Sequence, residues 1–135
     1  RDVVRPPGRA GVAGRPQPCH APSAMDWQSR ILFHDGEALV IDKPAGLAVH
    51  PGPKTPRSLE DALADLRFGF ARPPVPVHRL DRDTSGCLLL ARNPKAAARF
   101  QQAFASGAVM KTYAAVLDGE VEGEAGTIAL PLAKM

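Results

Sequence analysis

Residues 78–86 gather side chains that could do chemistry. These nine residues, His-Arg-Leu-Asp-Arg-Asp-Thr-Ser-Gly, contain two carboxylates, two guanidiniums, an imidazole and two hydroxyls. The apolar run at residues 87–91 follows at once and predicts a buried strand. Pro76 and Gly86 mark loop positions on either side, so the charges can lie on a bend at a strand end and need not enter a core unpaired. A polar loop that leads into a buried strand is a candidate active site.

Each part of this stretch also has an ordinary explanation. Residues 79–81 can form a surface ion pair, and residues 83–86 can be a plain turn. Residues 81–84 have some likeness to the Asp-x-Asp-x-Thr pattern of aspartyl phosphohydrolases, but the threonine comes one position early. The apolar strand also follows the acids, where Mg²⁺ geometry would want it before them. A serine hydrolase would require glycine at position 83, where Asp83 stands.

As a whole, residues 78–86 resemble the signature of the RluA-type RNA pseudouridine synthases: His-Arg-Leu-Asp, two variable residues, then Thr-Ser-Gly and an aliphatic strand. Two further stretches are similar to the same family, in the same order. Residues 40–51 read Val-Ile-Asp-Lys-Pro-Ala-Gly-Leu-Ala-Val-His-Pro, and residues 111–116 read Lys-Thr-Tyr-Ala-Ala-Val. Three ordered matches are far more specific than one, and the resemblance covers roughly residues 31–132.

The resemblance implies an enzyme that isomerises specific uridines in structured RNA, rRNA or tRNA, to pseudouridine by base flipping. It implies Asp81 as the catalytic residue, and leaves open whether Asp81 is a nucleophile or the base that removes a ribose proton. It places Arg79 near the displaced base and Tyr113 on the flipped uracil. The residues alone leave another reading open, in which Tyr113 is a strand aromatic that packs on the sheet.

Four more side chains complete the predicted RNA-binding set: His78, Arg82, Lys43 and Lys111. His78 could orient the loop backbone. Lys43 precedes a proline, which holds it extended, so it can project from a strand end toward RNA; a simple loop lysine explains it equally well. The reaction requires no cofactor and no metal ion, and the sequence contains no motif for either.

Basic charge is concentrated around the polar loop. Residues 43–111 contain eleven Lys or Arg and five Asp or Glu, a local charge of +6, whereas the whole chain carries +3. This distribution favours RNA as the partner, although a solvated face with no partner fits the charge as well. A non-catalytic RNA-binding module is therefore the main alternative, because it would keep the positive middle and Tyr113.

The composition is that of a soluble globular chain, with 44% apolar, 23% charged and 5% aromatic residues. The longest aliphatic run, about five residues, is far below the ~20 needed to cross a bilayer, so no membrane partner is expected. Cys19 and Cys87 suggest neither a disulfide framework nor a zinc site, and Cys87 is expected in the core. A monomer in the reducing cytoplasm is expected.

The pattern predicts an α+β fold, a mixed and largely antiparallel sheet with flanking helices, because strands and helices do not alternate regularly. A helix is predicted over about residues 59–66 with Ser58 as its cap, and another from Asn93 to Gly107. Strands are predicted over residues 31–33, 38–41, 87–91 and 109–117, and from residue 127.

Two regions are predicted along the chain. Residues 1–24, rich in Pro, Gly and Arg, are expected to be a disordered extension, with Met25 as the native start. Residues 25–135 are predicted to form the N-terminal portion of a pseudouridine synthase catalytic domain. The resemblance implies that the family's domain continues further, so its C-terminal part is expected to be missing here.

Overall fold

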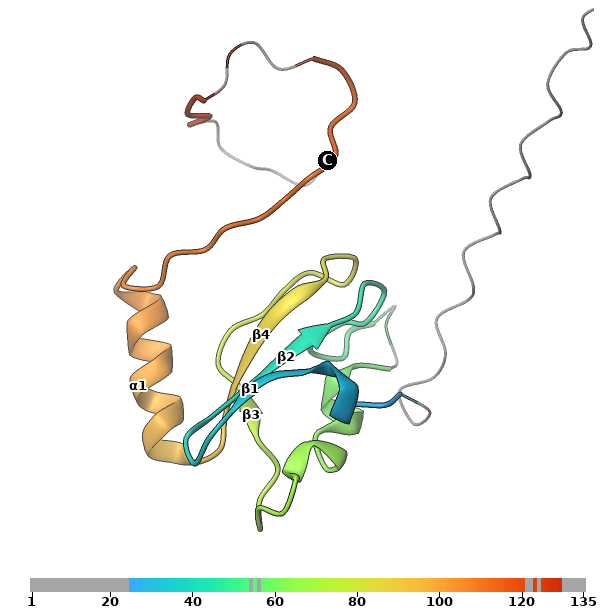
Figure 1. The fold of residues 1–135 in the computed structure, drawn as a ribbon, viewed down its shortest axis with the longest axis vertical. Helices are drawn as coiled ribbons and strands as arrows, with labels where there is room; N and C mark the ends of the chain where they lie inside the picture. Colours follow the sequence, from blue (N-terminus) through green and yellow to red (C-terminus); the bar gives the residue numbers. More distant parts are fainter. Residues whose placement is uncertain (1–24, 54, 56, 121–122, 124, 130–135) are drawn as a thin grey trace, which may run out of the picture.

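The computed structural model describes residues 25–53, 55, 57–120, 123 and 125–129. An antiparallel four-stranded sheet in the order β1-β2-β4-β3 forms its centre (Figure 1). The elements in chain order are η2 (Gln28–Arg30), β1 (Ile31–His34), β2 (Ala38–Lys43), η3 (Leu59–Ala62), η4 (Asp65–Arg67), β3 (Val75–Pro76), β4 (Gly86–Ala91) and α1 (Pro94–Ala105). The predicted α+β class is confirmed, and every pair of neighbouring strands is antiparallel. Residues 1–24, including Cys19, lie outside the described residues.

The long pairing between β2 and β4 sets the position of the polar loop. Six residue pairs run without interruption from Ala38↔Ala91 to Lys43↔Gly86. The last residue of β2 therefore lies opposite the first residue of β4. Because the loop at residues 77–85 leads directly into β4, this register brings the first two family-like stretches of the sequence together at one end of the sheet.

The two faces of β4 pack against different parts of the structure. Along β4, Leu88 and Leu90 belong to the main core, which η3 and η4 complete from one side. Leu89 and Ala91 face the opposite way and pack with α1 (Figure 1). The period-2 alternation of a strand explains this division, because successive side chains point to opposite faces. The apolar run of β4 thus belongs to a strand that is covered on both sides toward its C-terminal end, while Cys87 near its start is exposed.

Helix α1 begins and ends where its sequence predicts. The Asn93 side chain accepts a hydrogen bond from the Ala96 N–H at 2.8 Å, and Pro94 occupies the first helical position. Gly107, with φ 72°, follows the C-terminal end. The predicted continuous helix over residues 59–66 is wrong, because the segment forms the two short 3₁₀ helices η3 and η4. They end at Phe68, whose φ of 44° is left-handed, so the segment is too short to repay nucleation of a longer helix.

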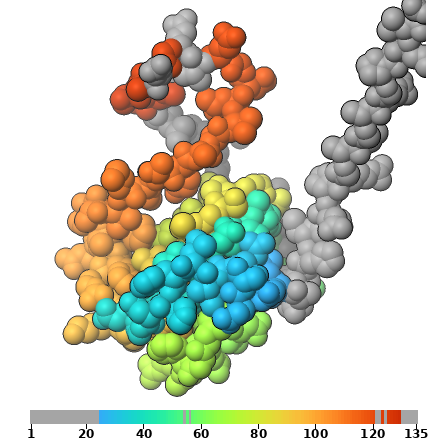
Figure 2. Space-filling model, in the orientation of Figure 1, coloured from blue at the N-terminus to red at the C-terminus, as the bar shows by residue number. Residues whose placement is uncertain are grey.

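Three further expectations also differ from the structure. The predicted strand at residues 109–117 has no regular secondary structure and is exposed, and Figure 2 shows this segment leaving the body after α1. A strand needs a neighbouring backbone to satisfy its hydrogen bonds, and no described strand pairs with these residues. Residues 127–129 likewise form no strand, and the rest of that prediction lies outside the described residues. Cys87 is exposed and not in the core, because it alternates with Leu88 and so faces away from the main core.

The core position of β4 gives a stability prediction. Leu88→Ala should lower the free energy of unfolding by about 2–5 kcal/mol, because Leu88 is fully buried and its removal leaves a cavity. Leu32→Ala is the matched control, since Leu32 is 55% exposed on β1 and should cost less than about 0.5 kcal/mol. Urea denaturation measures both; equal effects would contradict the assigned core.

Candidate active-site loop

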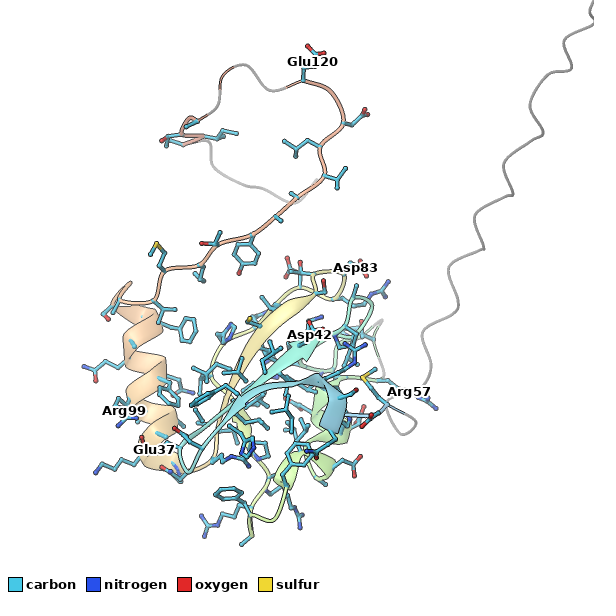
Figure 3. All side chains as sticks on the ribbon, in the orientation of Figure 1. Glu37, Asp42, Arg57, Asp83, Arg99 and Glu120 are labelled. Atoms are coloured by element: carbon cyan, nitrogen blue, oxygen red, sulfur yellow. The ribbon has the colours of Figure 1, made fainter. Side chains whose placement is uncertain are left out.

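The loop at residues 77–85 connects β3 to β4 at the end of the sheet where β2 also ends. In Figure 3 the labelled Asp83 lies at the outer end of this loop, above the label of Asp42 on β2. Leu80 is buried and belongs to the main core, so its side chain anchors the loop to the core. The Thr84 N–H donates to the Asp81 carbonyl oxygen at 3.1 Å, which closes a turn around the candidate catalytic residue.

A buried lysine fastens this loop to its neighbour. The Lys43 ammonium donates to the carbonyl oxygens of Leu47 at 2.7 Å, Pro44 at 2.9 Å and Arg82 at 3.2 Å. Its three N–H groups thus all have acceptors, which is what a buried ammonium needs. The Gly46 N–H donates to the same Arg82 carbonyl at 2.8 Å. One donor from the last residue of β2 and one from the loop after it therefore meet on one carbonyl beside Asp81.

Burial affects the pKa of the Lys43 ammonium more than the neighbouring charges do. Desolvation lowers the pKa of its ammonium from the ordinary 10.5, and the charges of Asp83 and Asp81 act in the opposite direction. The sequence predicted that Lys43 projects toward RNA. The structure instead encloses the side chain completely, because its donors are used inside the fold. In this structure Lys43 is a support of the loop and presents no amine at the surface.

The acids and guanidiniums of the loop lie at the surface. The Asp81 side chain is 88% exposed, and its Oδ1 lies 3.9 Å from Arg79 Nη2. Arg82 Nε donates to Asp83 Oδ1 at 3.3 Å. Such exposed pairs contribute little to stability, about 0–1 kcal/mol, so these side chains can exchange partners easily. The loop therefore combines a fixed backbone with charged side chains that are accessible from solvent.

His78 faces inward from the start of the loop. Its Nε2 accepts a hydrogen bond from the Leu89 N–H of β4 at 2.9 Å, and its ring stacks on Phe104 of α1 with centroids 4.5 Å apart. The ring is half-buried, so it is linked to two elements of the fold. The sequence allows His78 to orient the loop backbone, but it does not reveal Leu89 and Phe104 as the partners of the ring.

The structure does not bring Tyr113 and Lys111 onto the loop. Both belong to the exposed segment that follows α1, and the Tyr113 side chain is 60% exposed. Within the described ranges, no hydrogen bond or ring contact joins Tyr113 to residues 77–85. Lys111 is close enough for its charge to lower the pKa of His78. The roles implied for Tyr113 and Lys111 stay predictions.

Gly46 is a member of the site that sequence analysis missed. Its φ of 84° lies in the left-handed region, which glycine adopts without strain. This conformation accompanies the hydrogen bond from its N–H to Arg82. The signal in the sequence was the Lys-Pro-x-Gly string within residues 40–51, which was identified as similar to the family but without a role for its glycine.

Two kinds of site are absent from the described residues. In the described part of the chain, no three His, Cys, Asp or Glu side chains gather closely enough to hold a metal ion. No described helix has both the length and the apolar character to cross a membrane.

Comparisons with known proteins point to one family. Residues 37–134 match the family model described as RNA pseudouridylate synthase. An uncharacterised RNA pseudouridine synthase of Zymomonas mobilis is 58% identical over 106 residues, which cover 78% of this chain and 48% of that protein. Ribosomal large subunit pseudouridine synthase C of Vibrio vulnificus is 37% identical, with 98% of this chain and 43% of that protein covered.

The solved structure of human RNA pseudouridylate synthase domain containing 4 is also similar. It superposes with a TM-score of 0.52 at 34% identity, over 63% of this chain and 32% of that one. The chain thus spans roughly a third to a half of the length of these matched proteins.

The enclosed ammonium gives a second prediction. Lys43→Met should lower the free energy of unfolding by about 1–3 kcal/mol, because buried carbonyls of the two loops lose their donor. It should also speed hydrogen exchange at the Gly46 N–H, which reports on the link to Arg82. Lys95→Met is the control, since Lys95 is exposed on α1. A Lys43 variant that unfolds and exchanges like the control would contradict the supporting role.

Proposed function

Because this chain belongs to the RluA-type family of RNA pseudouridine synthases, we propose that it acts in the isomerisation of specific uridines in rRNA or tRNA to pseudouridine. The observation that carries the proposal is the meeting of two family-like stretches at one end of the sheet. Lys43 and Gly46 of the first bind the carbonyl of Arg82 in the second. The backbone of the loop that contains Asp81 is thereby fixed at Arg82, and the Asp81 carboxylate stays accessible to solvent.

The proposed chemistry needs only this carboxylate close to the sugar of the target nucleotide. The N1–C1′ bond of uridine breaks, the base turns, and a C5–C1′ bond forms; C5 then loses one proton and N1 gains one, directly or through solvent. In the proposal Asp81 acts on the ribose, either by attack on C1′ or by removal of a ribose proton. No atom is gained or lost overall, so no co-substrate is required.

The exposed guanidiniums of the loop support a nucleic-acid partner. Arg79 and Arg82 flank Asp81 at the surface and are held only by weak, exposed pairs with acids. In the proposal they bind phosphates or fill the space left by the flipped base, while the exposed ring of Tyr113 stacks on uracil. Flipping costs a few kcal/mol, and stacking on an aromatic recovers about 1–3 kcal/mol per base.

The alternative is RNA binding without catalysis. The 88% exposure of Asp81 and the separate location of Tyr113 favour this alternative for the described residues taken by themselves. The two functions differ in the fate of the uridine and share the partner. We further propose that the protein is cytoplasmic and monomeric, which cell fractionation and sedimentation would test.

Replacement of Asp81 separates the two functions. In the protein expressed from its complete gene and incubated with cellular RNA, Asp81→Asn should abolish pseudouridine formation, about 10³-fold or more, and leave RNA retention within about twofold. Mass spectrometry of digested RNA measures the product. Asp83→Asn removes the same charge from the same loop and is the control expected to keep most of the activity.

Normal pseudouridine formation by the Asp81 variant would remove this residue from the mechanism. Retention of RNA by a wild-type protein that forms no pseudouridine would instead establish the binding alternative.

The role of Arg82 can be tested through salt. Arg82→Ala should weaken RNA binding about equally for different sequences and reduce the slope of log K against log salt by about 0.7–0.9, the value for one lost phosphate contact. Arg99→Ala is the matched control, because Arg99 pairs with Glu37 and lies on α1. Filter binding at several salt concentrations gives the slopes. Identical slopes for the two variants would show that Arg82 contacts no phosphate.

A further inference from the structure

The hydrogen bonds of Leu89 show how the chain leaves the sheet. β3 pairs with β4 only through Val75↔Ala91 and Pro76↔Leu90. At the next step the Val77 N–H donates to the Leu89 carbonyl at 3.3 Å, as in a continuing ladder. The Leu89 N–H, however, donates to the Nε2 atom of the His78 ring at 2.9 Å. A side chain thus occupies the place where a strand backbone would supply the acceptor.

This substitution has a geometric consequence. A backbone N–H that is shielded from water requires an acceptor, and a strand that ends early would leave the part-buried Leu89 N–H without one. The imidazole supplies the acceptor, so the backbone from His78 onward no longer has to pair with β4. Three residues later the chain reaches Asp81 at the surface. Leu80, buried between them, holds the released chain against the core.

The same hydrogen bond defines the state of the ring. Nε2 can accept from an N–H group only through its lone pair, so the ring is neutral and its proton resides on Nδ1. Phe104 of α1 stacks on the ring at an interplanar angle of 23° and keeps it oriented toward β4. The His78 ring therefore links the loop to β4 and to α1.

We propose that His78 is a positioning residue, whose neutral ring replaces a backbone acceptor at the end of the β3–β4 ladder and thereby sets where the Asp81 loop begins. It acts through Leu89 and Phe104, with no contact to the substrate. The inference rests on the proposed function only for its effect on turnover; the effect on the loop can be measured without any RNA.

The surroundings of the ring favour the neutral form. Burial lowers the pKa of His78 from the ordinary 6.5, the Arg79 backbone opposes this, and the charge of Lys111 lowers it further. The elements packed against it contribute the apolar side chain of Phe104 and the backbone of Leu89. A lowered folded-state pKa means that the contribution of the hydrogen bond is complete above pH 6.5. It is lost as the pH falls below 6.5 and the folded ring takes up a proton.

The first experiment uses the wild-type chain. Nitrogen NMR of the His78 ring at pH 7.5 should show a protonated Nδ1 and an unprotonated Nε2. A proton on Nε2 would overturn the proposal without recourse to any variant. Acidification below the pKa of the ring should lower the protection factor of the Leu89 N–H, which is the ratio of its intrinsic to its observed exchange rate at the same pH. An unchanged protection factor after the ring titrates would also count against the proposal.

Substitutions then separate positioning from packing. His78→Phe keeps an aromatic ring on Phe104 but has no acceptor, so exchange of the Leu89 N–H should rise about three- to tenfold. His78→Gln offers an oxygen near the position of Nε2 and should restore most of the protection, with no dependence on pH around 6.5. His34→Phe is the control, because His34 is exposed at the end of β1. If the Phe variant fails to fold, the Gln variant and the ring spectrum still decide.

Turnover provides the readout specific to a positioning role. In the complete protein, His78→Phe should lower kcat for pseudouridine formation about tenfold with KM within twofold, and His78→Gln should recover kcat. Equal kcat for wild type and the Phe variant would overturn the effect on the loop. If the wild type forms no pseudouridine, the proposed function fails, while the spectrum and the exchange rates still test the position of the ring.

Discussion

The structure of the candidate site depends on one enclosed ammonium group. Lys43 is removed from water, and no carboxylate among the described residues forms an ion pair with it. Its charge is stabilised by three carbonyl dipoles and by the field of Asp83 and Asp81. Enclosing such a charge is costly unless all its donors are satisfied, so the geometry of the surrounding carbonyls is narrowly constrained. One of those carbonyls belongs to Arg82. The requirement to satisfy a buried charge thereby fixes the backbone next to the candidate catalytic residue.

The sheet lets this constraint act between residues that are far apart in the sequence. Lys43 and Arg82 are 39 residues apart, and the uninterrupted register of β2 against β4 brings their surroundings together. A shift of one residue in this register would turn Leu88 and Leu90 away from the main core. The burial of these side chains therefore protects the register, and the register places the loop. Packing in the centre and polar geometry at the end of the sheet are consequences of the same pairing.

The sequence predicted the elements whose information is local. The strand β4 and the helix α1 carry their own signals, an apolar run, Asn93 before Pro94, and Gly107 at the close, and these signals needed no distant partner. The strand predicted at residues 109–117 failed because a strand is completed by another backbone, and the sequence of one segment does not contain its neighbour. Lys43 was misplaced for a related reason. Nothing in Lys-Pro-Ala-Gly reveals that a carbonyl 39 residues away will accept from its ammonium group. For His78 a role in orienting the loop backbone was anticipated, but its partner Leu89 could not be predicted, because that contact depends on β3 ending after two residues.

The contrast between a fixed backbone and accessible side chains has a physical basis in the proposed reaction. A carboxylate that is enclosed in the free protein would need partners inside the fold, and those partners would compete with the ribose. Asp81 instead remains in water, while Leu80, Arg82 and His78 fix the backbone around it through the core, the Lys43 ammonium and β4. In the proposal, the flipped nucleotide itself excludes water from Asp81, so desolvation of the acid is coupled to the arrival of its substrate. The binding of RNA, and not the folding of the chain, would then supply the free energy for that desolvation.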